Sequence, residues 1–291
     1  MNLIGKRILV TGSTGFVGRN LVRGLKEHGA EVLTLTDRTG CRIDVRDWQR
    51  INEIGKLNIV YHLAAITSVP YSSENPRETY EVNVVGTLNM LELSRLRNVE
   101  KIVFAGSYIY GHPQYVPIDE EHPLGPSNPY AMSKGLAEDL CRAYHEYYAL
   151  KCVVLRVFNI YGEGQSDNFL IPSILKQLVN RKIELLDAEP RRDFVNVADV
   201  VNAYIKAGEY SGSGFEVFNI GSGVSHRVSD VVDLILNIVG TECNVVYKDE
   251  RRKSEIMDTV ADISKAKRLL KWEPSVTLKD GLRSMTKLAM P

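Results

Sequence analysis

The chain of 291 residues carries 36 basic and 36 acidic side chains, so its formal net charge at neutral pH is zero. A balanced charge without a long basic stripe argues against nucleic acid as the main partner. No stretch approaches the roughly 18 uninterrupted apolar residues of a membrane-spanning helix, and the first residues lack the apolar run of a secretory signal. The length is that of one large domain or two unequal ones.

The cysteines favour a reducing compartment. Cys41, Cys141, Cys152 and Cys243 are widely spaced, and no two form a C-x-x-C pair. The sequence therefore predicts no redox centre, no zinc centre and no other metal site. We interpret the four side chains as buried free thiols, which predicts a cytoplasmic protein.

A glycine loop follows the first predicted strand. Arg7–Val10 is a short apolar run typical of a buried parallel strand. Glycines at 12, 15 and 18 come next with the spacing G-x-x-G-x-x-G, and a helical pattern continues through Leu21 and Leu25. A strand, a tight glycine turn and a helix N-terminus bind a diphosphate, because the backbone approaches closely and its free N–H groups face the anion. The spacing differs by one residue from the G-x-G-x-x-G fingerprint, and a plain glycine turn is the alternative.

Acidic residues beyond the second predicted strand, 31–35, suggest which dinucleotide binds. Asp37 stands where a carboxylate accepts both ribose hydroxyls of NAD and repels the 2′-phosphate of NADP. The neighbouring Arg38 keeps NADP open, because a guanidinium can accommodate that phosphate. Asp44 precedes a predicted helix, where it is placed to reach the adenine amino group or to cap the helix.

Two further strands, predicted at 58–65 and 101–105, point to the same edge of a sheet. The first ends in small residues against which a cofactor can lie, and we interpret His62 within it as a packed side chain. A long helix with Asn83 near its middle is predicted from 75 to beyond 91. The second strand delivers Ser107 at its carboxyl end, the edge at which open α/β sheets bind ligands.

The candidate chemistry lies at the start of the next predicted helix. Tyr130 and Lys134 are four residues apart, so their side chains share one helix face. An ammonium within about 4 to 6 Å lowers the pKa of a phenol from about 10, which suits the pair to proton transfer. Ser107 can donate to a sugar or carbonyl oxygen while Tyr130 moves the proton. The alternative is an ordinary helix start with Pro129 in its first turn.

These motifs occur in the order found in one family, and the chain resembles the extended short-chain dehydrogenase/reductases. Within them it is similar to the NAD-dependent epimerase/dehydratase family, which acts on nucleotide sugars. The resemblance runs nearly end to end and rests on the motifs above and on the stretches 156–162, 192–199, 219–223, 261–266 and 270–274.

The resemblance implies an α/β fold with a Rossmann-type, doubly wound parallel sheet. The NAD-binding domain would span 1–160, with later segments at about 193–222 crossing back to it. Residues 161–291 would mainly form a smaller region that binds the nucleotide sugar. A homodimer is also implied, through the helices at 75–96 and 130–150, where Leu140, Tyr144 and Tyr147 share one face. Burial of this face in the monomer core is the alternative.

The resemblance also implies roles for individual residues. Tyr130 would be the acid/base, Lys134 would bind the nicotinamide ribose and lower the tyrosine pKa, and Ser107 would assist at the sugar. The other expected cofactor contacts are Gly12, Thr14, Gly15, Phe16, Val17, Gly18, Asp37, Arg38, Asp44, Val45, Leu63, Ala64, Ala65, Asn83 and Phe158. The substrate diphosphate would be held by Asn159, Arg192 and Arg252, with Asn168 and Phe169 nearby. The run 251–255 departs from the family's R-P-G-E form, which puts the role of Arg252 in doubt.

The residues after Ser107 bear on the reaction. Related dehydratases carry an acidic pair there, because eliminating water needs an extra acid and base, whereas this chain has Tyr108 and Ile109. The resemblance then predicts a 4-epimerase of a UDP-hexose or UDP-N-acetylhexosamine, in which hydride passes from C4 to NAD and returns to the opposite face. The main alternative is an NAD(P)H-dependent 4-keto-sugar-nucleotide reductase. A 4,6-dehydratase and a non-catalytic dinucleotide sensor are less favoured.

One position bears on sugar size. In similar epimerases, the residue four beyond the acid of the R-P-G-D/E run borders the sugar C2 substituent, and here that residue is Thr259. Because it is small, we expect room for an N-acetyl group. The identity of the nucleotide base stays open.

Overall fold

The computed structural model describes residues 2–36, 40–212, 214–250 and 255–289, with side chains described up to 287. Asp37, Arg38 and Arg252 lie outside the described residues. Their expected roles therefore remain predictions.

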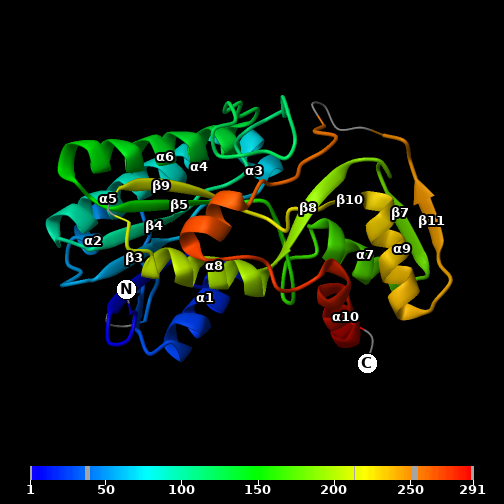
Figure 1. Cartoon of the computed structure of the whole chain (residues 1–291), viewed down its shortest axis with the longest axis horizontal. Coiled ribbons are helices and arrows are strands. Elements are labelled where there is room, and N and C mark those ends of the chain that lie inside the picture. The colour runs from blue at the N-terminus through cyan, green and yellow to red at the C-terminus, as the bar shows by residue number, and fades with distance from the viewer. Residues whose placement is uncertain (1, 37–39, 213, 251–254, 290–291) are drawn as a thin grey trace.

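A parallel sheet of six strands forms the larger half of the molecule, in the order β2-β1-β3-β4-β5-β9 (Figure 1). The strands that we predicted from the first half of the sequence are all present in it. In β1, β3 and β4 the large apolar residues are buried on both faces, as expected of a parallel sheet covered by helices, whereas Val32 and Leu33 of the edge strand β2 are half-buried. The expected Rossmann-type α/β fold is confirmed. The strands are β1 (Arg7–Thr11), β2 (Glu31–Thr34), β3 (Ile59–His62), β4 (Lys101–Ala105), β5 (Cys152–Val157) and β9 (Phe215–Ile220).

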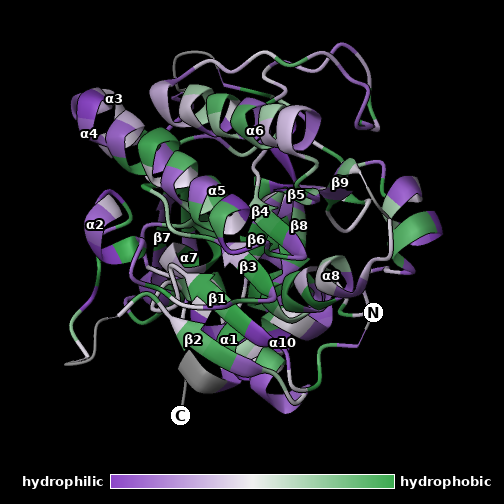
Figure 2. Ribbon diagram, turned by 90° about the vertical axis from the view of Figure 1, so that its left-hand side faces the viewer, coloured by the Kyte–Doolittle hydropathy of each residue, from purple (hydrophilic) through white to green (hydrophobic). Residues whose placement is uncertain are grey.

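Helices cover both faces of this sheet (Figure 1). On one face lie α1 (Phe16–Glu27) and α8 (Val197–Glu209), which share a core with Val10, Leu25 and Ile205. On the other lie α2 (Trp48–Ile51), α5 (Gly86–Leu96) and α6 (Pro129–Tyr148). Figure 2 shows α5 and α6 next to each other on the outer side of the sheet. Because α1 and α6 begin at the carboxyl ends of β1 and β4, their N-termini meet at the ligand-binding edge.

The helix predicted across 75–96 is interrupted. After a short α3 (Val69–Glu74), the chain forms α4 (Pro76–Tyr80), a π-helical turn η1 (Glu81–Val85) and then α5. Asn83 lies in the π turn, and the hydroxyl of Thr87 donates to its carbonyl at 2.6 Å. Such side-chain bonds to a carbonyl four residues back often bend helices. The predicted helix is therefore present, with a π turn at its middle.

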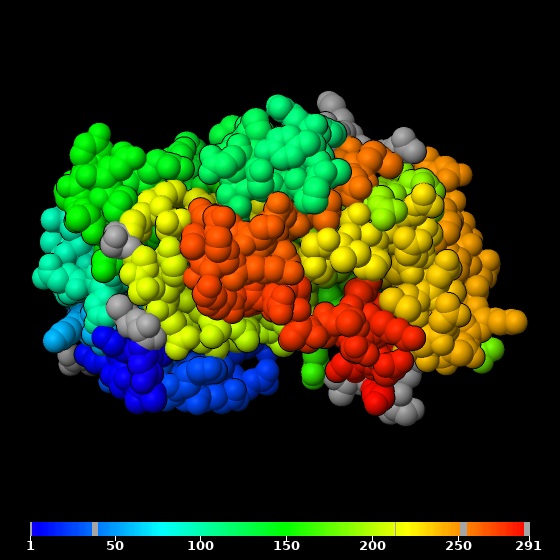
Figure 3. Space-filling view, in the orientation of Figure 1, coloured from blue at the N-terminus to red at the C-terminus, as the bar shows by residue number. Residues whose placement is uncertain are grey.

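The second half of the chain builds a smaller lobe around its own core of Ile174, Val231 and Leu282. One sheet has the order β10-β8-β6, and a separate pair joins β11 to β7. In the space-filling view, residues around η2 (Ala266–Leu270, orange) lie over α8 in the middle of the face shown (Figure 3). The remaining elements are β6 (Asn159–Tyr161), β7 (Lys182–Leu185), β8 (Arg191–Asn196), β10 (Ser225–Arg227), β11 (Asn244–Tyr247), α7 (Leu170–Leu178), α9 (Val228–Val239) and α10 (Leu278–Ala289).

The sequence analysis expected the cysteine thiols to be buried. Cys141 and Cys152 are buried, as expected, but Cys41 is exposed because it lies in the loop that follows β2.

No helix in the described part of the chain combines the length and hydropathy needed to cross a membrane.

Candidate active site

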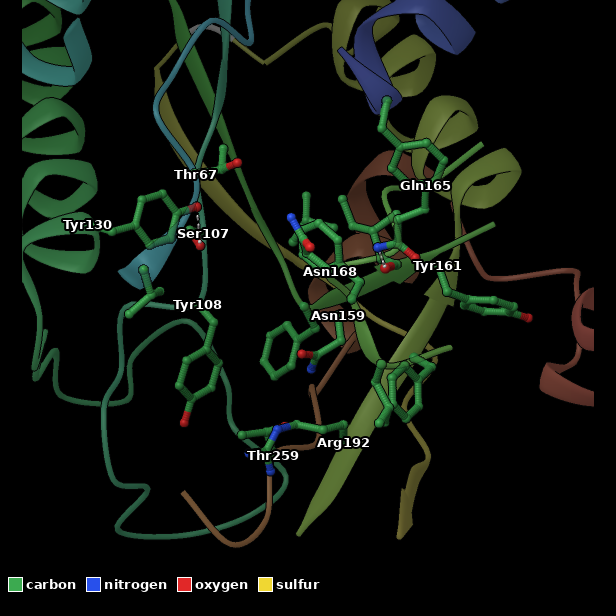
Figure 4. Close-up of a pocket in the computed structure, with 18 of the residues that line it drawn as sticks. Thr67, Ser107, Tyr108, Tyr130, Asn159, Tyr161, Gln165, Asn168, Arg192 and Thr259 are labelled. Carbon is green, nitrogen blue, oxygen red and sulfur yellow. Dashed lines mark hydrogen bonds between the residues drawn. The ribbon is translucent and has the colours of Figure 1, made fainter. Parts of the chain in front are cut away.

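A cleft of about 1450 Å³ opens between the carboxyl edge of the large sheet and the smaller lobe (Figure 4). Most residues that we predicted for the cofactor and the substrate line it, although they come from distant parts of the chain. They are Gly12, Thr14, Gly15, Phe16, Val17, Gly18, Leu63, Ala64, Ala65, Ser107, Tyr130, Lys134, Phe158, Asn159, Asn168, Phe169, Arg192 and Thr259.

The glycine loop has no room for side chains at two of its positions. Gly12 has a φ of +66°, and a Cβ there would lie 2.8 Å from the backbone nitrogen of Ala64. A Cβ on Gly18 would lie 2.1 Å from the Gly12 carbonyl oxygen. Gly15 caps α1 without any side-chain bond, so within the described part of the chain no side chain caps the first amide groups of the helix. Free amides at a helix N-terminus fit the diphosphate of a dinucleotide.

Two hydroxyls meet at the floor of the cleft. The Tyr130 phenol donates a hydrogen bond of 3.0 Å to Ser107 Oγ (Figure 4). Tyr130 lies in the first turn of α6, which Asn128 caps by accepting from the Ala131 amide at 2.9 Å. Ser107 comes two residues after β4. The strand end and the helix start therefore place the predicted acid/base beside its assisting serine.

Lys134 does not act on Tyr130 in the way that the sequence suggested. Its ammonium lies 4.3 Å from the centroid of the Phe104 ring, and no hydrogen bond joins it to Tyr130 among the described residues. Burial raises the pKa of Tyr130, and the bond to Ser107 only partly opposes that rise. The expected lowering of the tyrosine pKa is not seen in this structure, because desolvation outweighs the effect of the hydrogen bond with Ser107.

The lysine itself is strongly affected by its surroundings, which gives a pH prediction. Burial lowers the pKa of Lys134 from the ordinary 10.5 to about 8. Between these values the unfolded chain binds a proton that the folded chain has lost. This group therefore makes the free energy of unfolding rise with pH, by about 1.4 kcal/mol per pH unit. We expect Lys134→Met to remove that contribution, so the free energy of unfolding of the wild type should rise relative to that of Lys134→Met between pH 8 and 10.5.

Urea unfolding of both proteins at several pH values measures this difference in the free energy of unfolding. Lys26→Met, at an exposed lysine of α1, is the matched control and should follow the wild-type pH dependence. Parallel curves for wild type and Lys134→Met would contradict the prediction.

Three residues that we predicted for the cofactor lie outside the lining of the cleft. The Asp44 carboxylate is exposed and pairs with Arg46 at 2.6 Å. Val45 is buried against Gly86. Asn83 is buried, and its amide group accepts from the Ile66 N–H at 2.7 Å and donates to the Ile66 carbonyl at 3.0 Å. In this structure Asn83 holds the backbone next to the cleft.

The far end of the cleft carries a cation, Arg192 on β8. Its guanidinium pairs with Glu255 and donates to the Ile256 carbonyl at 2.7 Å. Beneath it the buried Asp193 accepts from the backbone amides of Gly223 and Ala261, both at 3.0 Å. These bonds fix β8, so Arg192 faces the cleft from a rigid element.

Several lining residues were missed by the sequence analysis. Tyr108 follows Ser107 directly, and its hydroxyl donates to the Gly111 carbonyl at 2.6 Å. Its position directly after Ser107 was the signal that could have identified it. Glu255 also lines the cleft, and no local sequence pattern marked it or the remaining residues. The other lining residues that the sequence analysis did not name include Thr67, Asn128, Gln165, Leu186, Lys248 and Ile256.

His62 is packed, as the sequence analysis predicted. Its ring is buried between the hydroxyls of Thr11, at 2.7 Å, and Thr87, at 3.0 Å. Among the described residues, no group of three or more His, Cys, Asp or Glu side chains is placed to hold a metal ion.

Comparison with known proteins identifies the family. The model of the NAD dependent epimerase/dehydratase family matches residues 8–221. The chain belongs to this family. It is 33% identical to a putative UDP-glucose 4-epimerase of Methanocaldococcus jannaschii over 95% of this chain and 96% of the relative. It is 30% identical to GDP-6-deoxy-D-mannose reductase of Pseudomonas aeruginosa over 96% of both chains.

A solved member of the family has the same fold. UDP-N-acetylglucosamine 4-epimerase from Methanobrevibacter ruminantium M1, in complex with UDP-N-acetylmuramic acid, is 28% identical and superposes with a TM-score of 0.90 over 98% of both chains. Epimerases and a reductase of the family are thus both similar to this chain along nearly its whole length.

Proposed function

We propose that this chain is an NAD-dependent nucleotide-sugar 4-epimerase that oxidises C4 of a UDP-hexose or UDP-N-acetylhexosamine and returns hydride to the opposite face. The observation that carries the proposal is the Tyr130–Ser107 hydroxyl pair at the floor of a cleft that runs from the glycine loop to Arg192. An epimerase needs such continuity, because dinucleotide, sugar and diphosphate must share one cavity.

Different residues along the cleft would bind the cofactor, transfer the proton and bind the substrate diphosphate. The loop at 12–18 and the N-terminus of α1 would hold the diphosphate of NAD, which when bound supplies the hydride acceptor and donor. Tyr130 would take the proton of the C4 hydroxyl and later return it, while Ser107 hydrogen-bonds the same oxygen. Arg192 and Asn159 would hold the sugar diphosphate, for which a guanidinium is well suited.

Substrate binding would rearrange the arginine. Both Nη atoms of Arg192 are engaged, Nη1 by backbone carbonyls and Nη2 by Glu255. A diphosphate is a stronger competitor for a guanidinium than a single carboxylate. We therefore expect Glu255 to give up part of this pair when substrate binds.

The reductase remains the second candidate, because one similar relative is a GDP-6-deoxy-D-mannose reductase. It would use the same Ser107, Tyr130 and Lys134 but consume reduced cofactor. The released cofactor and the cofactor requirement separate the two candidates.

The test is to denature the purified protein, identify any released nucleotide by mass and absorbance, and incubate native protein with UDP-glucose and UDP-N-acetylglucosamine without added cofactor. Bound NAD together with interconversion at C4 supports the epimerase. An empty protein that needs NADPH and acts only on 4-keto sugars would favour the reductase. Bound NAD without turnover of any nucleotide sugar would favour a sensor.

Thr259 gives the proposal a prediction about sugar size. Its side chain is 4% exposed and lines the cleft, and its hydroxyl has no partner among the described residues. We expect Thr259→Tyr to fill space beside the sugar and to lower kcat/KM for UDP-N-acetylglucosamine about tenfold or more relative to UDP-glucose. Steady-state kinetics with both substrates measures the ratio. Thr259→Ser is the control and should keep it, while an unchanged ratio in Thr259→Tyr would remove Thr259 from the sugar site.

We also propose that the enzyme is a homodimer. Leu88 on α5 and Met132 and Leu136 on α6 are 38 to 42% exposed, on neighbouring helices. Leu140 and Tyr144, which we expected on this face, are partly buried against the core. A second copy of the same helix pair would cover the exposed apolar side chains.

The dimer proposal predicts that Leu136→Glu yields a monomer, because a buried unpaired carboxylate disfavours the contact. Light scattering after size exclusion reports the mass. Val179→Glu is the matched control, because Val179 caps the C-terminus of α7 and its side chain is 72% exposed. A wild-type monomer, or a Leu136→Glu dimer, contradicts the proposal.

Two further assignments belong with this function. We place the enzyme in the cytoplasm, since a nucleotide-sugar substrate and unpaired buried thiols such as Cys141 suit a reducing compartment. We assign NAD binding to 1–160 with 193–222, and nucleotide-sugar binding mainly to 161–291.

A further inference from the structure

A buried chain of hydrogen bonds begins beside the glycine loop. Thr11 precedes Gly12, and its Oγ1 accepts from the amides of Leu63 at 3.1 Å and Ala64 at 3.0 Å. A hydroxyl has two acceptor sites and one proton. With both acceptor sites used, Thr11 must donate its proton to Nδ1 of His62, 2.7 Å away.

The direction of the next bonds follows from this one. Because Nδ1 accepts, the neutral ring of His62 carries its hydrogen on Nε2 and donates it to Thr87 Oγ1 at 3.0 Å. Thr87 donates in turn to the Asn83 carbonyl at 2.6 Å. Burial lowers the pKa of His62 to about 3, and the positive charge of Lys134 adds to this effect, so the ring is neutral near pH 7.

The chain of bonds ends at the catalytic helix. Asn83 Nδ2 donates to Ser133 Oγ at 2.8 Å, and Ser133 Oγ donates to the backbone carbonyl of Tyr130 at 2.8 Å. The Asn83 amide also holds the backbone of Ile66. The path thus runs from β1 through β3, α5 and η1 to the first turn of α6.

All five linking side chains are buried. Thr11, Thr87 and Ser133 are 0% exposed, and His62 and Asn83 are 1% exposed. Apolar side chains could fill the same space, and they would leave no buried polar atoms that need hydrogen-bond partners. Fully satisfied buried networks fix one arrangement of the elements that they join. The elements joined here carry the cofactor-side backbone, 63–66, and the catalytic Tyr130.

We infer that His62 and Thr87 are positioning residues of the active site, which act through Asn83 and Ser133 to hold the first turn of α6 in register with the cofactor-side backbone. This inference rests on the proposed function for its kinetic consequence, because hydride transfer needs the tyrosine and the cofactor at a fixed separation. A misplacement of about 1 Å can cost roughly 100-fold in rate.

The test compares Thr87→Val with Thr87→Ser. The valine keeps the shape but leaves the His62 Nε2–H without an acceptor, whereas the serine keeps the hydroxyl. We expect Thr87→Val to lower kcat about tenfold or more with little change in KM, and Thr87→Ser to restore it to within about twofold. Ser133→Ala, at the other end of the path, should lower kcat similarly. The Thr87→Val/Ser133→Ala double variant should lose little more than either single one, because both break the same path.

A second readout does not depend on turnover. Hydrogen exchange of the amides of residues 63–66 and 129–134 should speed up in Thr87→Val and stay at the wild-type rate in Thr87→Ser. If no nucleotide sugar is turned over but the exchange pattern appears, the proposed function fails and the positional coupling stands. The inference is overturned if Thr87→Val and Ser133→Ala melt at lower temperature but keep kcat within about twofold, or if exchange changes only next to the substituted residue.

Discussion

Tyr130→Phe should lower kcat by about 1000-fold, the middle of the range for a general acid/base. In the proposed reaction the phenol, which is hydrogen-bonded to Ser107, exchanges a proton with the C4 hydroxyl, and phenylalanine keeps the ring without that proton. Turnover of UDP-glucose by the cofactor-loaded protein measures kcat. Cofactor binding and the melting temperature should stay close to wild type, because the ring still fills its place.

Two comparisons sharpen this prediction. Tyr148→Phe, at the far end of the same helix and 55% exposed, should leave kcat unchanged. Ser107→Ala should cost less than Tyr130→Phe, because it removes an assisting hydrogen bond. A Tyr130→Phe variant that retains more than about a tenth of wild-type kcat would exclude the phenol as the acid/base.

Glu138→Gln should give a large loss of stability, about 3 to 5 kcal/mol in the free energy of unfolding. Glu138 pairs with Arg156 through two contacts, one at 3.1 Å from Nε, and both side chains are 3% exposed. Removing one charge leaves the other buried without a counter-charge. Arg156 also donates to the Tyr110 hydroxyl at 2.9 Å and to the Glu120 carbonyl at 3.3 Å. The pair therefore joins α6 and β5 to the loop that follows Ser107.

Urea unfolding measures this loss. The matched control is Glu92→Gln, whose partner Arg95 is 37% exposed, and it should cost no more than about 1 kcal/mol. Glu138→Leu combined with Arg156→Met should recover part of the loss, because no buried charge remains. A cost below about 1 kcal/mol for Glu138→Gln would show that the pair contributes little.

The local elements of the site could be predicted because their chemistry is local. The glycine spacing reflects backbone crowding at Gly12 and Gly18 within one strand–turn–helix unit. Tyr130 and Lys134 are adjacent by helix geometry alone. Since parallel strands end at one edge of the sheet, Ser107 could also be expected near them.

Other features depend on packing between distant segments. The Arg192–Glu255 pair joins residues 63 positions apart, and no local pattern marks it. Asn83 was expected at the cofactor, but in this structure its amide holds Ile66, 17 positions earlier in the sequence. The Tyr108 ring also packs edge-to-face on Phe158, with ring centroids 5.4 Å apart, and Phe158 is distant in the sequence.

The sequence by itself determined the family, the sheet and the glycine loop, because each follows from the spacing of residues within one element or from the order of the motifs, and it supplied the residues that we propose to react. The tertiary structure decided their electrostatic state. Burial raises the pKa of Tyr130 and lowers that of Lys134, whose ammonium lies over Phe104. Desolvation and the direction of buried hydrogen bonds depend on what surrounds a side chain in space, and residue spacing carries no information about those surroundings.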